Sequence, residues 1–430
     1  KGKILYIIFF ILAFALFITN NIYYSMTNSF FDFSLVLLAG EGSDYFLDAI
    51  INCNIWVYIS SIIIIFSFIV ALKEFPNREK TKLKNIIKVF FIFLIVHSII
   101  PLFLGKANNE LTWSTWRNPR NIYINFNDNN KSMTITGIYE YSVRNFYITF
   151  IKAKKTTNEE DLTFLETEYS KEDIPENNNY TGIFKDKNLI MIMMESIDSW
   201  LINNDTMPTL VNLQNTGLNF TNRYSPTFGG GATINTEFSS LTGYYATVTN
   251  KPIYFYDKNN YGYSLPNLFK NNNYNVNSVH MNTGSFYNRL SFHKALGFTN
   301  HYAMKDLVKD VDFEDDTNLI KNNISYNHII DKNNKFMTFI TTYSPHVPYI
   351  DNDLCKSLDT TPFEIENDEE TTCVRTLANV TDNFIKLLIN RLQEDNLLDD
   401  TVIVLYTDHY TYGYSNTARW TNITDPKLSQ

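Results

Sequence analysis

Three long apolar runs without a charged residue occupy the first quarter of the chain, and they restrict its fold more than any other feature. They cover residues 4–19, 55–72 and 89–104. Each approaches the ~20 residues that a helix needs to cross roughly 30 Å of hydrocarbon. Buried core helices would normally keep a polar face, and a signal peptide would not be followed by two further spans. We therefore predict three membrane-spanning helices.

The basic residues around these runs predict the orientation of the spans. Those before the first run and between the second and third are Lys1, Lys3, Lys73, Arg78, Lys80, Lys82, Lys84 and Lys88. By the positive-inside rule both segments stay in the cytoplasm. We therefore expect a multi-pass protein of the cell membrane, with everything after about residue 105 outside the cell. The apolar stretch 33–40 is too short to span and is expected to be re-entrant or interfacial.

We place the membrane anchor at residues 1–105. The residue composition changes twice after it. Residues 106–187 are polar, with Asn-rich and acidic stretches, and are expected to form a juxtamembrane linker. Within it, residues 139–151 are amphipathic enough to lie on the membrane or to pack against the next domain. Since the chain begins with Lys1 and ends at Gln430 shortly after its last motif, we expect further segments on both sides.

From residue 188 to residue 430, short apolar runs alternate with helical patterns, which is typical of an α/β domain with a largely parallel sheet. The predicted strands are residues 188–194, 274–279, 336–342 and 402–407, and helices are predicted at 208–216 and 375–397. The net charge of −9 argues against a nucleic-acid partner, because neutralising phosphates needs clustered Lys and Arg.

Each predicted strand ends at or near a residue that can bind a metal or move a proton. These residues are Glu195, His280, His346, Asp408 and His409. Ligands of open α/β sheets bind beyond the carboxyl ends of the strands. A lone His or Glu at such a place is more often structural or solvated, but four strand ends together favour a functional site.

A glycine-rich stretch precedes a threonine at a predicted helix start. Gly229, Gly230 and Gly231 allow positive φ and close backbone approach, and a helical pattern begins at Thr233. Backbone amides and the helix dipole there favour an anion such as phosphate. The alternative is a simple glycine turn with Thr233 as the helix N-cap, and this stretch alone fits both interpretations.

A threonine hydroxyl is a poor nucleophile at neutral pH and needs a base or a cation. Glu195, Asp408 and His409 could supply a cation site. Mixed oxygen and imidazole ligands suit Mn²⁺ or Zn²⁺, and carboxylate-dominated sites suit Mg²⁺. The residue types do not choose between these metals.

Five segments, in order, resemble one family. They are residues 193–196 (MMES), 233–238 (TINTEF), 280–289 (HMNTGSFYNR), 343–349 (YSPHVPY) and 402–410 (VIVLYTDHY). As a set they are similar to the lipoteichoic acid synthases of the alkaline phosphatase and sulfatase superfamily, from about Ile86 to the end of the chain. The resemblance implies membrane helices followed by an extracellular sulfatase-like domain. It also implies a phosphoglycerol transferase that moves glycerophosphate from phosphatidylglycerol to a glycolipid or polyglycerolphosphate acceptor.

The resemblance further implies the residues of the site. One Mn²⁺ or Mg²⁺ ion would be held by Glu195, Thr233, Asp408 and His409, and Thr233 would carry the phosphoglyceryl group covalently. The glycerophosphate would be held by Phe286, Tyr287, Arg289 and His346. Arg289 can donate two hydrogen bonds to one phosphate, and His346 can exchange a proton with the departing or incoming oxygen. His280 is a weaker candidate.

The chain departs from the family pattern at three positions. Ala232 stands where a basic residue is usual, Tyr287 where Trp is usual, and Thr407 where Gly is common. A sulfatase-type Cys or Ser followed two residues later by Pro and then Arg is absent around Thr233, which argues against sulfate-ester hydrolysis. Two alternatives stay open: a phosphodiesterase, phosphatase or phosphoethanolamine transferase that uses the same site, and a non-catalytic envelope protein.

Two of the three cysteines flank an acidic insertion. Cys355 and Cys373 could form a structural disulfide in an oxidising exterior. Their spacing alone does not establish the geometry that a disulfide requires. Cys53 lies at the edge of a predicted membrane span.

Overall fold

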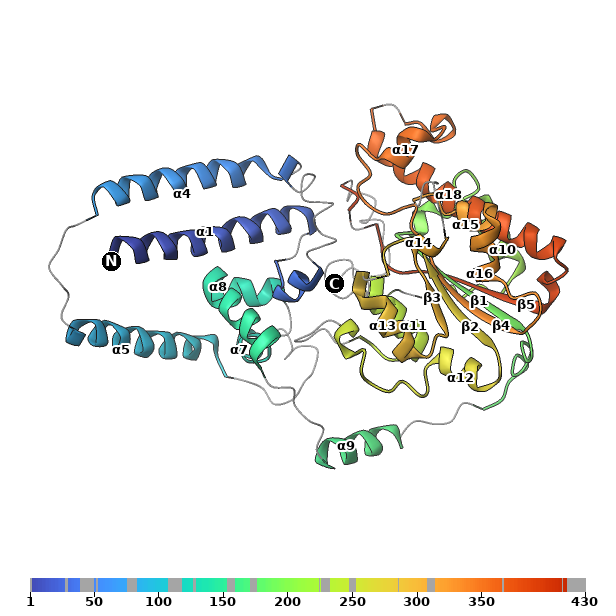
Figure 1. Cartoon of the computed structure of the whole chain (residues 1–430), viewed down its shortest axis with the longest axis horizontal. Helices are drawn as coiled ribbons and strands as arrows, with labels where there is room; N and C mark the ends of the chain where they lie inside the picture. The colour runs from blue at the N-terminus through green and yellow to red at the C-terminus, as the bar shows by residue number, and fades with distance from the viewer. Residues whose placement is uncertain are drawn as a thin grey trace.

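The computed structural model describes most of the chain in an extended set of helices followed by a layered α/β part (Figure 1). The described residues are 2–27, 30–38, 50–51, 53–75, 83–106, 118–126, 129–152, 159–170, 176–223, 225, 233–246, 253–284, 286–307, 314–365, 367–411 and 413–415. The glycine-rich stretch before Thr233 lies outside these residues.

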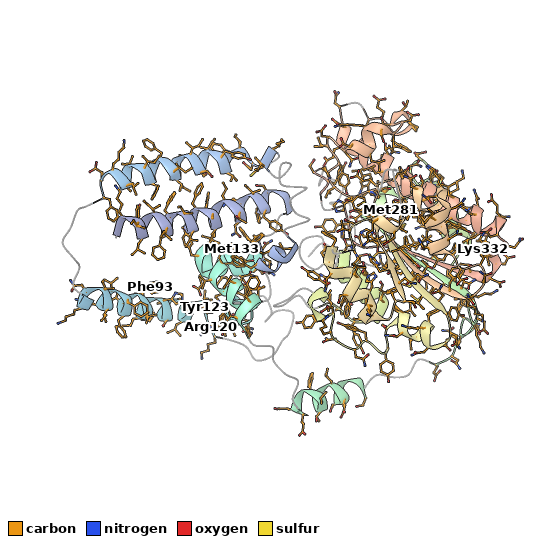
Figure 2. All side chains as sticks on the ribbon, viewed as in Figure 1. Phe93, Arg120, Tyr123, Met133, Met281 and Lys332 are labelled. Atoms are coloured by element: carbon orange, nitrogen blue, oxygen red, sulfur yellow. The ribbon has the colours of Figure 1, made fainter. Side chains whose placement is uncertain are left out.

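The three apolar runs form helices, as predicted. They are α1 (Gly2–Thr27), α4 (Ile55–Lys73) and α5 (Leu83–Ile99), the last continued by η2 (Ile100–Leu104). By length and composition each is able to cross a membrane. α1 and α4 lie side by side, with Phe10 stacked on Phe68 at 3.6 Å between ring centroids. Most of the other apolar side chains on these helices point outward, as lipid-facing side chains would (Figure 2).

A helical segment lies between the spans and the sheet. It comprises α7 (Pro119–Asn125), α8 (Asn129–Phe146), the π-helical turn η3 (Tyr147–Ile151) and α9 (Glu159–Tyr169), with η1 (Phe33–Leu38) packed beside α8. The hydroxyl of buried Tyr141 donates to the carbonyl of Phe31, and the Asn145 side chain accepts from the backbone N–H of Phe33. The amphipathic stretch 139–151 is therefore helical and packs against the residues that follow α1.

A five-stranded, wholly parallel sheet with strand order β3-β2-β4-β1-β5 forms the centre of the α/β part. The strands are β1 (Asn188–Met194), β2 (Asn275–His280), β3 (Asn300–Tyr302), β4 (Phe336–Thr341) and β5 (Thr401–Thr407). The predicted α/β class and parallel sheet are confirmed. The edge strand β3 was not predicted, because its three residues Asn-His-Tyr give no apolar run.

Helices cover both faces of the sheet, and the alternation of side chains along β1 shows why. Ile190, Ile192 and Met194 point into a core cluster shared with α10 (Pro208–Thr216), α15 (Asn318–Lys321), α16 (Asn323–Ile329) and α18 (Glu369–Glu394). Met191 and Met193 point to the opposite cluster, shared with α11 (Thr233–Thr242), α12 (Leu265–Asn271) and α13 (Arg289–Leu296). A period of two along a strand that is buried on both faces gives this continuous apolar run.

Shorter elements complete the chain. They are η4 (Ser199–Leu201), η5 (Ile253–Tyr256), η6 (Phe286–Asn288), α14 (Met304–Leu307), α17 (Asp353–Ser357), η7 (Thr361–Phe363) and η8 (Leu398–Asp400). The predicted helix 208–216 has its bounds confirmed, with Pro208 in its first turn. The helix predicted at 375–397 begins earlier, at Glu369, because Asp368 accepts from the backbone N–H of Thr371 and the acidic residues favour the first turn.

All three cysteines are buried and none forms a disulfide. Cys355 on α17 and Cys373 on α18 belong to the same core cluster. In this state they contribute as small apolar side chains of the core.

Gly297 ends α13 at φ +107°, and a Cβ added there would lie 2.5 Å from Cγ and Oδ1 of Asn267. We expect Gly297→Ala to lower the free energy of unfolding by about 3 kcal/mol, because both backbone strain and this clash oppose it. Gly243, at φ +77° with no atom within 4 Å of an added Cβ, is the matched control. Gly243→Ala should cost only about 1 kcal/mol. Urea denaturation of the detergent-solubilised chain measures both, and equal losses would contradict the assignment of the clash.

Candidate active site

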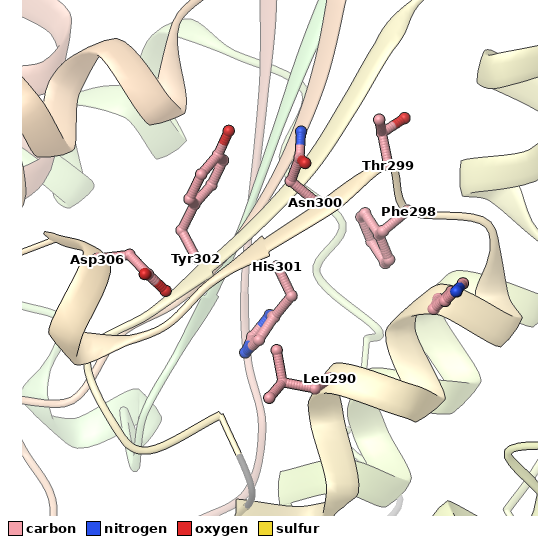
Figure 3. Close-up of a pocket in the computed structure, with 8 residues that line it drawn as sticks. Leu290, Phe298, Thr299, Asn300, His301, Tyr302 and Asp306 are labelled. Carbon is pink, nitrogen blue, oxygen red and sulfur yellow. The ribbon is translucent and has the colours of Figure 1, made fainter.

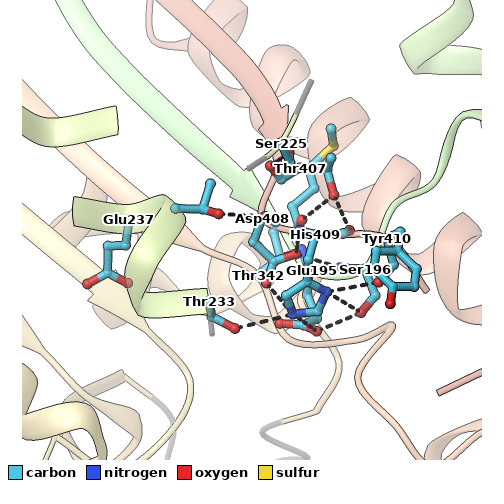
Figure 4. Close-up of polar contacts among 12 residues, drawn as sticks. Glu195, Ser196, Ser225, Thr233, Glu237, Thr342, Thr407, Asp408, His409 and Tyr410 are labelled. Carbon is cyan, nitrogen blue, oxygen red and sulfur yellow. Dashed lines mark hydrogen bonds and ion pairs between the residues drawn. The ribbon is translucent and has the colours of Figure 1, made fainter. Parts of the chain in front are cut away.

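The carboxyl ends of β1 and β5 bring three titratable side chains together. The register pairs Met194 with Thr407, so the residues after each strand are neighbours. Ligand atoms of Glu195, Asp408 and His409 all lie within 4.8 Å of one another. Nε2 of His409 is 3.1 Å from Oδ2 of Asp408 and 3.7 Å from Oε1 of Glu195 (Figure 4). The three residues predicted as metal ligands thus form one cluster.

The hydrogen bond at Nδ1 sets the orientation of the His409 ring. This nitrogen is 3.0 Å from the carbonyl oxygen of Tyr410, which can only accept a proton. With the proton on Nδ1, the lone pair lies on Nε2, the nitrogen that faces Glu195 and Asp408. A backbone carbonyl commonly fixes metal-binding imidazoles in this way.

Hydrogen bonds hold one oxygen of each carboxylate. Ser196, at φ 50°, donates its N–H to Oδ1 of Asp408 at 2.9 Å and its hydroxyl to Oε1 of Glu195 at 2.8 Å. The N–H of His409 also donates to Oδ1 of Asp408, at 2.7 Å. The other carboxylate oxygen of Asp408, Oδ2, is buried and accepts no hydrogen bond from the part of the chain that the structure describes. A buried acceptor of this kind needs a partner, and a cation would supply one.

The electrostatics of the cluster also fit a cation. Glu195, Asp408 and His409 are exposed by only 4%, 0% and 2%. Burial, and then the charge of Glu195, raise the pKa of Asp408 to about 7. Burial would lower the pKa of His409, but the two carboxylates outweigh it and raise that pKa. Two carboxylates, one imidazole and a nearby hydroxyl form a donor set that suits a divalent metal ion.

Thr233 is the first residue of α11, as predicted, and its side chain faces the cluster. Its Oγ1 is 3.5 Å from Nε2 of His409. Thr236, on the same helix, donates its hydroxyl to the carbonyl of Asp408 at 2.6 Å. This bond ties the start of α11 to the end of β5 and brings the hydroxyl of Thr233 to the cluster.

Two further histidines lie at the same edge of the sheet: His280 is the last residue of β2, and His346 follows β4. Nδ1 of His346 is 2.7 Å from the carbonyl of Val347, and the ring stacks on Tyr343 at 5.1 Å. Burial and the nearby His409 lower its pKa, so the imidazole is neutral near pH 7. His280 ends β2, with Nδ1 3.0 Å from the carbonyl of Thr341. Burial and the charge of Arg289 lower its pKa to about 3.

Besides His346, the predicted substrate-binding residues lie on η6 and at the start of α13. Phe286 and Tyr287 are in ring contact at 4.3 Å, and the Tyr287 ring is 5.2 Å from Cζ of Arg289. Arg289 is only 1% exposed, and its Nε and Nη2 donate to Oε2 of Glu237 at 3.2 and 3.1 Å. Two of its donors are therefore already in use within the protein.

Glu237 was not identified from the sequence. It is fully buried on α11, and it also bonds Nε2 of His293 through Oε1. Burial opposes its ionisation, but Arg289 and His293 outweigh burial and hold its pKa well below the usual range. One feature of the sequence could have indicated it: Glu237 is the single charged residue of helix 233–242 and follows Thr233 by one helical turn.

Thr407, which stands where the family commonly has Gly, lies at the end of β5 beside the cluster. Its hydroxyl is 3.2 Å from the carbonyl oxygen of Met194 and 3.0 Å from that of His409. The side chain therefore links β1 to the cluster. Ala232, the second departure, lies outside the described residues.

Comparison with known proteins identifies similar chains. The family model described as Sulfatase matches residues 187–425. Lipoteichoic acid synthase 2 of Bacillus subtilis (strain 168) is 25% identical over 435 residues, which cover 94% of this chain and 62% of that protein. The lipoteichoic acid synthase of Staphylococcus saprophyticus is 26% identical over 424 residues, covering 93% and 62%. The resemblance seen in the five segments is confirmed, and the chain spans about 62% of the length of these relatives.

The crystal structure of the lipoteichoic acid synthase LtaP from Listeria monocytogenes has a TM-score of 0.49 and 26% sequence identity, covering 57% of this chain and 61% of that one.

Removing one carboxylate of the cluster should weaken metal binding. We expect Glu195→Ala to lower the affinity for Mn²⁺ at least about tenfold, because an oxygen ligand is lost from a site with few donors. The matched control is Asp205→Ala, which removes an exposed carboxylate ten residues further along the chain. Calorimetric titration of the metal-free protein measures both, and an unchanged affinity in Glu195→Ala would disprove the ligand assignment.

Metal affinity should also depend on pH. Because the pKa of Asp408 is raised to about 7, a proton competes with the metal below that pH. The affinity for Mn²⁺ should therefore fall by up to about tenfold for each pH unit below 7 and level off above about pH 8. Titrations between about pH 5.5 and 8.5 measure this profile. A flat profile would contradict proton competition at Asp408.

Proposed function

We propose that this chain, which belongs to the sulfatase family, is a membrane-anchored, metal-dependent phosphoglycerol transferase. One observation carries the proposal: the hydroxyl of Thr233 lies 3.5 Å from Nε2 of His409, within the buried cluster of Glu195, Asp408 and His409. Similarity to lipoteichoic acid synthases over 94% of the chain supports phosphatidylglycerol as the donor. A glycolipid or a growing polyglycerolphosphate chain is the acceptor.

The metal in this proposal is Mn²⁺ or Mg²⁺. Glu195, Asp408 and His409 would hold it, together with the hydroxyl of Thr233. When bound, such an ion stabilises negative charge on phosphoryl oxygens and favours the deprotonated form of a nearby hydroxyl. The N–H groups at the start of the ten-residue helix α11 add a second stabilising field for an anion at this position.

Thr233 is the nucleophile in the first half of the reaction. Its Oγ1 forms a bond to the phosphorus of phosphatidylglycerol as the bond from phosphorus to the diacylglycerol oxygen breaks. Diacylglycerol leaves with a proton, and the glycerophosphoryl group stays on Thr233. Arg289 and Tyr287 hold this group. Arg289 donates to Glu237, which follows Thr233 by one turn of α11, and the Tyr287 ring lies 5.2 Å from Cζ of Arg289.

In the second half an acceptor hydroxyl attacks the same phosphorus and Thr233 is released. His346 suits proton transfer in this step, because its Nδ1 faces the carbonyl of Val347 and leaves Nε2 as the acceptor nitrogen. Its lowered pKa keeps the imidazole neutral and ready to take the proton. The proton then neutralises the departing oxygen of Thr233 or the diacylglycerol oxygen of the next cycle.

Lipid substrates account for the apolar helices. Three helices able to cross a membrane precede the catalytic residues, and a donor lipid with its headgroup at the bilayer surface is accessible to an enzyme anchored beside it. We place the protein in the cell membrane with the catalytic part on the extracellular side.

Loss of the nucleophile should abolish transfer. We expect Thr233→Ala to reduce diacylglycerol release from phosphatidylglycerol by about 1,000-fold or more and to remove the phosphoglyceryl adduct seen by intact-mass analysis. The control is Ser239→Ala on the same helix, whose hydroxyl donates to the carbonyl of Asn235. Activity of Thr233→Ala equal to the control would end the proposal. Free glycerophosphate as the sole product would instead indicate the phosphodiesterase alternative.

A further inference from the structure

A continuous chain of buried polar side chains begins at Glu237. Oε2 of Glu237 accepts from Nε and Nη2 of Arg289, and Oε1 bonds Nε2 of His293. Nδ1 of His293 lies 2.7 Å from the hydroxyl of Ser278, which is 2.9 Å from Nδ1 of His301. Both carboxylate oxygens of Glu237 therefore have fixed partners, and the side chain cannot rotate without breaking one of them.

The last side chain of this hydrogen-bonded series, His301, lies at the edge of the sheet. His301 is on β3 and lines a pocket of about 310 Å³ together with Leu290, Phe298 and Tyr302 (Figure 3). His293 and Ser278 are 1% and 0% exposed, so the middle of the chain is closed to water. The hydroxyl of Ser278 thus holds the His293 ring at Nδ1, while Glu237 holds it at Nε2.

One nitrogen of the Arg289 guanidinium, Nη1, has no partner among the described residues. This nitrogen is buried. A buried cationic donor without an acceptor is costly, whereas Nε and Nη2 each donate a hydrogen bond to Glu237. Nη1 is therefore the part of Arg289 that is available to an anionic oxygen.

Glu237 also sets the distance between this donor and the nucleophile. It follows Thr233 by four residues on α11, so the two side chains leave the same face with Cβ atoms about 5–6 Å apart. Arg289 comes from another helix, 52 residues later in the sequence. The carboxylate thus ties the guanidinium to the nucleophile's own helix, and the Tyr287 ring lies 5.2 Å from Cζ.

We propose that Glu237 is a positioning residue for phosphate recognition: it fixes Arg289 one helical turn from Thr233, with Nη1 directed to an oxygen of the substrate's phosphate. The proposal rests on the proposed function for the substrate class, a phosphate ester. Among the described residues, the hydrogen bonds of the Glu237 carboxylate go to Arg289 and His293 and to none of the proposed metal ligands, so its role is indirect. The ion pair with Arg289 keeps the carboxylate charged, and His293 keeps it oriented.

Binding of inorganic phosphate and of glycerol phosphate to the full chain in detergent, loaded with Mn²⁺, tests the proposal by calorimetry. We expect Glu237→Gln to weaken binding of both probes by about tenfold or more, with Mn²⁺ affinity within about twofold of wild type. Glu237→Asp keeps the charge but withdraws the carboxylate by one methylene, and should weaken phosphate binding at least about threefold. This variant retains a compensated Arg289 and guards against loss of folding.

A double-mutant cycle separates positioning from a general effect. In an Arg289→Met background, Glu237→Gln should change phosphate affinity by less than about twofold, because the residue acts only through Arg289. The matched control is Asp382→Asn, which removes another buried carboxylate, one that accepts from the N–H groups of Thr209 and Leu210 at α10. Its phosphate affinity should equal that of wild type.

Three results would overturn the proposal: unchanged phosphate affinity in Glu237→Gln, an equal loss in the Arg289→Met background, or no phosphate binding by wild type. None of these measurements uses phosphatidylglycerol. If the variants behave as expected while wild type transfers nothing from that lipid, the proposed function fails and the role of Glu237 stands. If transfer occurs but Glu237→Gln binds phosphate normally, the reverse holds.

Discussion

The burial of two carboxylates and an imidazole against one another is the interaction on which the site depends. Asp408 and Glu195 would repel each other in a water-free environment unless a positive charge or a proton lay between them. The parallel sheet forces this proximity, since β1 lies directly beside β5 and both strands end at the same level. The fold therefore gathers negative charge that a divalent cation would neutralise, and the hydroxyl of Thr233, the proposed nucleophile, lies 3.5 Å from Nε2 of His409.

Helix α11 organises the rest of the site around that demand. Thr233 faces His409, Thr236 holds the backbone of Asp408, and Glu237 holds Arg289. These three residues lie on one and a half turns of one rigid helix, so they keep the proposed metal ligands, the proposed nucleophile and the guanidinium of Arg289 in a fixed relation. The apolar side of the same helix, with Ile234, Phe238 and Leu241, is anchored in the core below the sheet.

Much of this could be predicted from local patterns. The strands β1, β4 and β5 are continuous apolar runs because both faces of the sheet are covered, and each run ends at a residue with ligand chemistry. β3 escaped prediction because an edge strand of three polar and aromatic residues has no such run. Glu237 escaped it because a glutamate in a helix is usually solvated, and only burial against Arg289 and His293 gives it another role.

The sequence by itself determined the apolar helices, the α/β class and the identity of the candidate ligands, because each of these follows from residue types and periods within a short window. The tertiary structure decided which donors remain available. Ser196 reaches Asp408 across 212 residues, and Glu237 takes two donors of Arg289 across 52. Such pairings depend on how strands and helices meet in space, and no periodicity along the chain records them.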